Sequence, residues 1–326
     1  MAEITLIEAV TQALAYELKH DPSVVVLGED VGVNGGVFRA TAGLHARFGS
    51  ERVIDTPLDE TSIAGLAVGM AFQGMKAVAE AQFDGFIFPM MDHIVCHAAR
   101  MRTRTRGRLH CPMVLRAPWG GGIRAPEHHS EAPEALFAHI PGLRVVIPSS
   151  PARAYGLLLA AIRDPDPVIF FEPKRIYRQY KEEVADDGEA LPLDVCFVLR
   201  DGSDLTLVTW GAHVKEALEA ADALAGEGIS TEVIDVATVK PLDFDTIHES
   251  VKKTGRCVIV HEAARTCGIG AEIAAQLAEK AMFDLVAPVE RVTGYDTPMP
   301  LFRLEMKYLP SVDRIVAAAK RTLAYR

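Results

Sequence analysis

The chain of 326 residues has the composition of a globular protein that is long enough for two domains. Hydrophobic residues make up 49% and charged residues 24%, which excludes intrinsic disorder, collagen-like repeats and a small disulfide scaffold. Lys and Arg total 34 against 44 Asp and Glu, giving a formal net charge of −10. Because phosphate contacts need a basic surface, this charge disfavours nucleic acid as a partner.

The cysteines and the N-terminus give a further set of exclusions. The five cysteines are odd in number and form no C-x-x-C pair, which argues against a zinc ribbon and a disulfide framework. The first residues show neither a secretory signal nor an Arg- and Ser-rich transit segment, and no run of 18 apolar residues occurs. We therefore expect a bacterial cytoplasmic protein with no membrane span.

The first half of the chain alternates helix and strand patterns. The Thr5-x-x-Glu8 spacing of a capping box predicts a helix through about Lys19. Short apolar runs predict strands, and longer periodic or small-residue segments predict helices. The expected strands are 24–27, 53–55, 77–81, 113–115, 145–147 and 168–171, and the expected helices are 60–72, 90–104 and 151–162. Strands separated by helices predict an α/β fold with a doubly wound, mostly parallel sheet.

An acidic, weakly apolar segment divides the chain. It predicts a first domain at 1–180, a linker at 181–192 and a second α/β domain at 193–326. Within the second domain we expect strands at 205–208, 231–234 and 257–260, and helices at 213–225, 268–281 and 311–323.

Common enzyme motifs are missing, and several polar patterns have plain structural interpretations. The chain has no phosphate-binding G-x-x-x-x-G-K-[ST] loop, no G-x-G-x-x-G after a strand and no G-x-S-x-G. The glycines at 32–36 and 120–122 favour turns. His93, Cys96 and His97 share one face of the predicted 90–104 helix and could hold a metal, but no further ligand stands out, so packing is the favoured interpretation.

Two polar segments are better candidates for chemistry. Residues 55–60 run from a strand end into a helix start, and ligands bind at the carboxyl ends of parallel strands. Asp59 is equally well explained as a helix cap. Residues 126–131 form a polar loop with two adjacent histidines, which are also common at surfaces.

An ordered series of short motifs makes the pattern specific. The motifs are Gly28-Glu29-Asp30-Val31-Gly32, the run 55–60, Glu80-Ala81-Gln82-Phe83, Phe86-Ile87-Phe88-Pro89, Arg116-Ala117-Pro118-Trp119-Gly120, His129-Ser130-Glu131-Ala132-Pro133-Glu134, Pro141-Gly142-Leu143, Phe170-Phe171-Glu172-Pro173-Lys174, Lys253-Thr254-Gly255-Arg256, His261-Glu262-Ala263 and Gly294-Tyr295-Asp296-Thr297-Pro298. Over nearly the whole chain this series resembles the β subunit of the E1 component of 2-oxo acid dehydrogenase complexes. The resemblance implies a pyrimidine-binding, transketolase-like domain followed by a domain like the transketolase C-terminal domain.

Details within the series favour the branched-chain type of this family. The segment 170–174 and the context of Trp119 resemble that type, whereas the segment 28–38 also resembles bacterial pyruvate-type subunits. Phe86 stands where the branched-chain type often has tyrosine. A pyruvate or acetoin type is therefore the alternative.

The resemblance implies thiamine diphosphate bound at an interface with an E1 α subunit. Glu60 matches the glutamate that hydrogen-bonds the aminopyrimidine ring, and Leu58, Gln82 and Phe86 match cofactor-binding positions. Gln82, Phe86 and His129 match the substrate pocket. His129 also matches the histidine that protonates the dithiolane of a lipoyl group during acyl transfer, so Glu60 and His129 are the expected catalytic residues.

Two metal ions are implied in the same way. The α subunit would hold Mg²⁺ through a Gly-Asp-Gly motif, which this chain lacks. A structural potassium ion would be bound, largely by backbone carbonyls, near positions Cys111, Met113, Val114, Ala161, Asp164 and Asp166.

The resemblance thus predicts an α2β2 enzyme of the EC 1.2.4 class. It would oxidatively decarboxylate a branched-chain 2-oxo acid and acylate the lipoyl group of the E2 acyltransferase. The chain would be active only with its α subunit. A non-catalytic scaffold or an electron-transfer subunit with the same fold is the alternative from another class.

Overall fold

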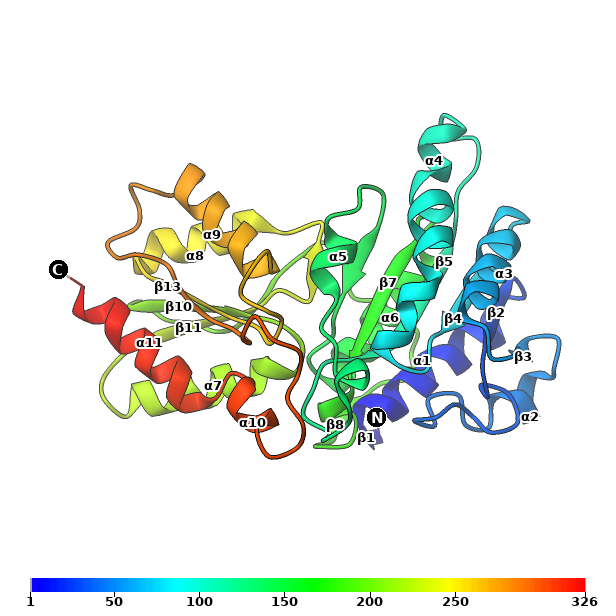
Figure 1. The fold of residues 1–326 in the computed structure, drawn as a ribbon, viewed down its shortest axis with the longest axis horizontal. Helices are drawn as coiled ribbons and strands as arrows, with labels where there is room; N and C mark the ends of the chain where they lie inside the picture. Colours follow the sequence, from blue (N-terminus) through cyan, green and yellow to red (C-terminus); the bar gives the residue numbers. More distant parts are fainter. Residues whose placement is uncertain (1, 326) are drawn as a thin grey trace. The chain divides into compact units, whose positions relative to one another are not determined.

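A computed structural model describes residues Ala2–Tyr325, which divide into two compact units (Figure 1). Unit 1 comprises the residues up to Trp119 together with Leu136–Leu193, and unit 2 comprises Gly120–Ala135 and the residues from Asp194 onward. The acidic segment 181–192, which composition predicts as a linker, belongs to unit 1. The inclusion of Gly120–Ala135 in unit 2 has no counterpart in the sequence pattern.

Unit 1 is built on a parallel sheet whose strands run in the order β6-β7-β5-β4-β2-β3. These strands are β2 (Val24–Gly28), β3 (Val53–Asp55), β4 (Lys76–Glu80), β5 (Met113–Trp119), β6 (Arg144–Val146) and β7 (Val168–Pro173). Every residue of β2, β5 and β7 is buried, as expected of a parallel sheet covered on both faces. A separate antiparallel pair joins β1 (Ala2–Ile4) to β8 (Glu182–Val184), within the predicted linker.

Helices cover the two faces of this sheet. The helices are α1 (Leu6–His20), α2 (Leu44–Phe48), α3 (Glu60–Phe72), α4 (Met101–Arg104), α5 (Glu134–Ala138) and α6 (Pro151–Arg163). Helices α1 and α6 pack together on one face, and α3 lies on the opposite face (Figure 1). The predicted capping box starts α1: the Thr5 backbone N–H donates to Glu8 at 2.8 Å, and the Glu8 N–H donates to the Thr5 hydroxyl.

The predicted α-helix at 90–104 is wrong in its geometry. The segment begins earlier, with a 3-10 helix η1 (Asp84–Met90), and continues as a π-helix η2 (Asp92–His97), a 3-10 turn η3 (Ala98–Arg100) and the short α4. Apolar residues three and four apart predict a helical face but do not distinguish i→i+4 from i→i+5 hydrogen bonding. A second short 3-10 turn, η5 (Lys174–Ile176), follows β7.

Unit 2 is a second α/β sandwich. Its sheet has the strand order β14-β13-β10-β11-β9, and only β9 runs antiparallel to its neighbour. The strands of unit 2 are β9 (Phe197–Arg200), β10 (Leu205–Thr209), β11 (Thr231–Asp235), β12 (Thr238–Lys240), β13 (Cys257–Val260) and β14 (Glu290–Val292). Helices α7 and α11 cover one face and α8 and α9 the other (Figure 1).

The helices of unit 2 are α7 (Val214–Ala225), α8 (Phe244–Thr254), α9 (Ile269–Lys280), α10 (Glu305–Tyr308) and α11 (Val312–Ala324), with 3-10 turns η4 (Glu127–His129) and η6 (Gly211–His213). Helix α8 was not predicted, although Asp243 caps its start and Gly255, in the left-handed conformation, ends it. Together the two units confirm the predicted two-domain α/β class. No helix within Ala2–Tyr325 has the length and apolar character needed to span a membrane.

Candidate functional site

Strands β2, β3 and β4 end opposite one another at the carboxyl edge of the unit 1 sheet. Gly28 of β2 pairs with Asp55 of β3 on one side and with Glu80 of β4 on the other, and Glu80 pairs with Arg116 of β5. From β2 the chain goes outward to β3 and then returns to β4 on the other side of β2. Such a reversal is a topological switch point, where open α/β sheets bind ligands.

Four of the predicted site residues follow strands that end at this edge. Leu58 and Glu60 come after β3, and Gln82 and Phe86 come after β4. Leu58 is 71% exposed, so its apolar side chain is accessible at this edge. Glu60 and Gln82 are half-buried, and within the described residues the Glu60 carboxylate and the Gln82 amide make no hydrogen bond or ion pair. Both polar groups are therefore available to a bound molecule.

The loop between β2 and α2 adds further carboxylates to this edge. Burial raises the pKa of Glu29, and the negative charges of Asp30 and Glu60 raise it further. The Asp55 carboxylate accepts hydrogen bonds from the backbone N–H groups of Gly32 at 2.5 Å and Val33 at 3.1 Å. The loop is thus fastened to the end of β3, and the edge carries excess negative charge.

Asp59 occupies the position of a helix cap, but its side chain makes no capping hydrogen bond to the helix backbone. It is the N-cap residue of α3, and its carboxylate accepts a hydrogen bond from the Ser62 hydroxyl. This bond holds the pKa of Asp59 below its usual range. Asp59 is therefore committed to the start of the helix, whereas Glu60, the first residue within it, is not.

A chain of aromatic rings extends from the edge into unit 1. The Phe86 and Phe83 ring centroids are 5.9 Å apart, those of Phe83 and Phe38 are 5.3 Å apart, and those of Phe38 and Tyr177 are 5.2 Å apart. These distances fit edge-to-face and tilted aromatic contacts. Phe86 is thereby held at the edge as an apolar wall.

A buried ion network is hydrogen-bonded to Tyr177, the last of these rings. Arg116, 1% exposed, donates to Glu172 at 2.6 and 3.0 Å and to Glu80 at 2.8 Å, and the Tyr177 hydroxyl donates to Glu172 at 2.7 Å. Burial raises the pKa of Glu80, with the Arg116 charge opposing the effect. The network links the end of β4 and the end of β7 through the middle of β5, and it was not predicted. Charged residues inside otherwise apolar strands were the available signal.

A second buried pair fixes the segment that carries Phe86. The Lys174 ammonium donates to the Asp84 carboxylate, and both side chains are fully buried. Asp84 begins η1, two residues before Phe86, so this pair anchors that segment to the chain after β7.

His129, the fifth predicted site residue, belongs to unit 2. It ends η4, and its ring lies 4.4 Å from that of His128 between centroids. Its loop, Gly120–Ala135, is held by two buried glutamates of unit 2. Glu262 accepts from the Gly121 N–H at 2.6 Å, and Glu305 accepts from the N–H groups of Gly122 at 2.8 Å and Arg124 at 3.0 Å.

The glycine triplet makes this attachment possible. Gly120 has φ +83°, and a Cβ there would lie 2.7 Å from the Glu262 carboxylate. Glu262 also lies 3.1 Å from His213 Nε2. The sequence predicts only a turn at the glycines 120–122. In the structure these glycines allow the backbone to approach two buried carboxylates.

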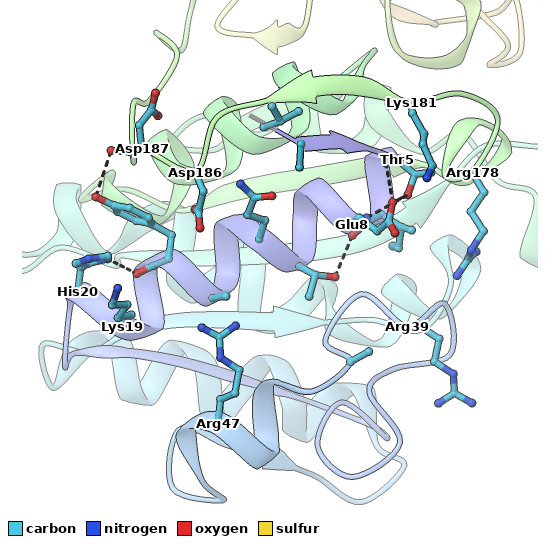
Figure 2. A pocket seen from close by; sticks show the side chains of 18 residues that line it. Thr5, Glu8, Lys19, His20, Arg39, Arg47, Arg178, Lys181, Asp186 and Asp187 are labelled. Atoms are coloured by element: carbon cyan, nitrogen blue, oxygen red, sulfur yellow. Dashed lines mark hydrogen bonds between the residues drawn. The ribbon is translucent and has the colours of Figure 1, made fainter.

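A large cavity in unit 1 lies away from these residues. It has a volume of about 1110 Å³ and is lined by α1, by residues 39–47 and by residues 178–187. Figure 2 shows cationic side chains around it, namely Lys19, Arg39, Arg47, Arg178 and Lys181. No described carboxylate forms an ion pair with these five groups. The cavity contains none of the predicted site residues, so cavity size does not identify the predicted site.

Comparison with known proteins decides the family. Residues 2–179 match the family model for the transketolase pyrimidine binding domain, and residues 196–315 match the model for the transketolase C-terminal domain. The chain is 52% identical to the pyruvate dehydrogenase E1 component subunit beta of Acholeplasma laidlawii, covering 98% of each chain. It is 48% identical to the protein of the same name in Bacillus subtilis strain 168, covering 100% of each. The chain belongs to the E1 β subunits of 2-oxo acid dehydrogenases.

A solved structure supports the fold of this E1 β subunit. A chain titled "Split gene transketolase, inactive beta4 tetramer" superimposes with a TM-score of 0.82 at 25% sequence identity, covering 99% of each chain. The predicted transketolase-like, two-domain fold is therefore confirmed. The predicted branched-chain preference finds no support among these relatives, whose names agree with the pyruvate alternative.

The predicted potassium positions of this E1 β subunit lie around the end of α6 and the start of β5. The Asp164 carboxylate accepts from the Arg144 guanidinium at 3.1 Å, and Asp166 accepts from Arg102 at 2.7 Å. Burial and the Asp166 charge raise the pKa of the Cys111 thiol to about 12. With both carboxylates paired to arginines and the thiol protonated, the backbone carbonyls remain as oxygen donors.

Replacing Glu305 with Ala should release the loop that carries His129. The N–H groups of Gly122 and Arg124 would lose their acceptor, and each lost hydrogen bond would cost about 0.5–1.5 kcal/mol because both residues are partly open to solvent. Limited trypsin digestion followed by mass spectrometry should then detect faster cleavage after Arg124. Hydrogen–deuterium exchange should also accelerate at residues 121–124.

Glu279→Ala removes an exposed glutamate on α9 and is the matched control. It should leave both rates at the wild-type value. Unchanged exchange at residues 121–124 in the Glu305 variant would contradict the anchoring role.

Proposed function

We propose that this chain is the β subunit of a pyruvate dehydrogenase E1 and supplies half of a thiamine diphosphate site. The observation that carries the proposal is the partnerless Glu60 carboxylate, which begins a helix at the switch point of the sheet. High identity to pyruvate dehydrogenase β subunits over the whole chain supports it. A non-catalytic scaffold does not require a carboxylate and an amide left without partners at that edge.

The residues at the edge fit the pyrimidine half of thiamine diphosphate. That cofactor, when bound, supplies the electron sink for decarboxylation of a 2-oxo acid. Glu60 would accept a hydrogen bond from the pyrimidine ring, which requires an acceptor with no competing protein donor. Gln82 offers both a donor and an acceptor to cofactor or substrate. Leu58 and Phe86 would exclude water from the reacting centre.

His129 would act on the second substrate, a lipoyl group. Opening the dithiolane breaks its S–S bond as one sulfur takes the acyl group and the other takes a proton. Imidazole suits this proton donation because its ordinary pKa lies near neutrality. Glu262 and Glu305 would hold the His129 loop in place for this step.

Pyruvate is the proposed substrate, in place of a branched-chain 2-oxo acid. The names of the relatives favour it, and Phe86 departs from the tyrosine often found in the branched-chain type. An apolar pocket discriminates between substrates by about 1–3 kcal/mol per methylene, so modest changes in the wall decide the preference.

The remaining parts of the site would come from an α subunit in an α2β2 assembly. Because the chain has no Gly-Asp-Gly motif, Mg²⁺ and the diphosphate would be held mainly by that partner. The acyl group would pass to an E2 lipoyl acyltransferase. A potassium ion near positions 111–114 and 161–166 would depend on backbone carbonyls, which suit a hard cation.

Replacing Glu60 with Gln should lower pyruvate decarboxylation by the assembled enzyme about 10²–10⁴-fold, the usual range for a group that assists proton transfer. The amide keeps the shape of the side chain but loses the charged acceptor. Steady-state turnover with an artificial electron acceptor measures the effect. Glu51→Gln, an exposed change before β3, is the control, and near-normal turnover of the Glu60 variant would remove Glu60 from the mechanism.

Replacing His129 with Ala should separate the two half-reactions. Lipoyl acylation should fall by at least about 10²-fold, while decarboxylation measured with an artificial acceptor should change much less. The adjacent His128, whose side chain is 51% exposed, supplies the matched control His128→Ala. Equal losses in both half-reactions would assign His129 to substrate binding instead.

A further inference from the structure

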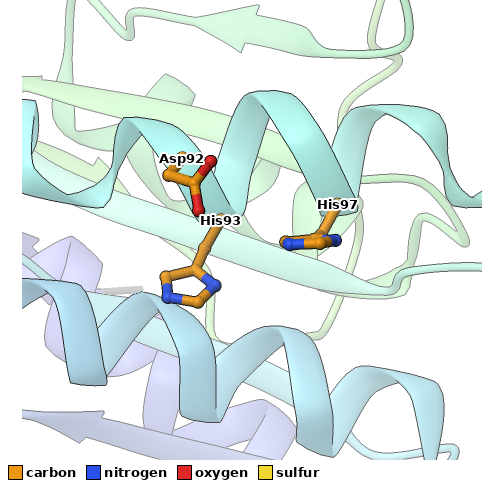
Figure 3. A group of neighbouring side chains, drawn as sticks. All are labelled: Asp92, His93 and His97. Carbon is orange, nitrogen blue, oxygen red and sulfur yellow. The ribbon is translucent and has the colours of Figure 1, made fainter.

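Three side chains on the π-helix η2 form a compact group of potential metal ligands. Asp92, His93 and His97 each offer one ligand atom, and these atoms all lie within 4.8 Å of one another. Figure 3 shows the three side chains along this short helical segment. None of them is among the residues of the candidate site, so the group is a separate feature of unit 1.

The π-helix determines which side chains meet. In an i→i+5 helix, Asp92 and His97 are one hydrogen-bonded turn apart, and His97 lies four positions after His93. The His93 and His97 ring centroids are 5.8 Å apart. An α-helix would have grouped Cys96 with the two histidines, as the sequence predicts, but the observed turn brings in Asp92 instead.

The three ligand groups have no competing partners. Within Ala2–Tyr325, no hydrogen bond or ion pair engages the Asp92 carboxylate or either imidazole. This contrasts with Asp164 and Asp166, which are paired with arginines. Asp92 is exposed and both histidines are half-buried, so solvent can reach the group and supply further ligands to an ion.

Gly65 of α3 leaves room for the group and supports it. A Cβ at residue 65 would lie 3.2 Å from both Cε1 and Nε2 of His93, so any larger residue would press on the ring. The His93 ring therefore rests against the backbone of α3. This contact restricts the ring before any ion arrives and lowers the entropy lost on binding.

We propose that Asp92, His93 and His97 bind a divalent transition-metal ion, with Zn²⁺ as the ion of choice. Two imidazoles and one carboxylate are a donor set that zinc sites use, with water completing the coordination. Mg²⁺ and Ca²⁺ prefer sites built from oxygen ligands and should bind much more weakly here. The proposal is independent of the proposed pyruvate chemistry.

Isothermal titration of Zn²⁺ into the untagged, chelator-treated full chain tests the proposal. A Cys267→Ser background removes the one exposed thiol among the described residues. One equivalent of Zn²⁺ should bind. His93→Gln and His97→Gln should each weaken binding at least tenfold, since even losing a group that only supports a metal ligand typically costs about 10–100-fold. His45→Gln, on α2, is the control and should leave the affinity unchanged.

Two further variants separate the observed group from the one that an α-helix would form. Asp92→Asn should weaken Zn²⁺ binding and Cys96→Ser should not. Co²⁺ should give visible absorption bands that disappear in the His93→Gln/His97→Gln double variant. Circular dichroism checks that each variant folds. If the double variant does not fold, the Asp92→Asn variant still tests the site, because Asp92 is exposed.

Several results would overturn the proposal. They are the absence of Zn²⁺ binding to the wild-type chain, unchanged affinity in the single histidine variants, dependence on Cys96 but not on Asp92, and equal affinity for Mg²⁺.

Discussion

The buried contact of Arg116 with two glutamates is the constraint on which the candidate site depends. Arg116, in the middle of β5, lies between Glu80 at the end of β4 and Glu172 near the end of β7. Removing one partner of such a buried pair typically costs about 3–5 kcal/mol because the remaining charges lose their compensation. The desolvation penalty makes the net stabilisation small, so the main effect of the network is to fix how these strand ends lie.

Further contacts connect this edge to the segments that carry the predicted site residues. Tyr177 connects Glu172 to the aromatic rings that end at Phe86, and the Lys174–Asp84 pair fastens the start of η1. Buried carboxylates also fix a segment in unit 2, where Glu262 and Glu305 hold the backbone of the loop that carries His129. In both units buried carboxylates fix the position of segments that carry predicted site residues.

Local patterns in the sequence predict much of this fold. The Thr5 capping box predicts the start of α1, and the apolar runs predict the parallel strands closely, because these depend on neighbouring residues alone. The ordered motifs predict that Glu60 and Gln82 belong to one site, and in the structure both residues follow strands that end at the same edge of the sheet. The position of the potassium ligands and the roles of the catalytic residues stay predictions.

The features that local patterns do not predict depend on distant contacts or on hydrogen-bond geometry. Arg116 meets Glu172 across 56 residues of sequence, and Gly121 meets Glu262 across 141. The assignment of Gly120–Ala135 to unit 2 follows from such contacts. The exchange of Cys96 for Asp92 in the ligand group follows from a π-helix, which apolar periodicity does not distinguish from an α-helix.

The proposed function requires that the chain carries half of a thiamine diphosphate site and that the assembled enzyme acts on pyruvate. The most direct measurement compares kcat/KM for pyruvate and for 2-oxoisovalerate, using the chain alone and the chain assembled with an α subunit that carries Gly-Asp-Gly. The account predicts no turnover by the chain alone, and thiamine diphosphate-dependent turnover with a preference for pyruvate in the assembly. Full turnover by the isolated chain, or a preference for 2-oxoisovalerate, would contradict it.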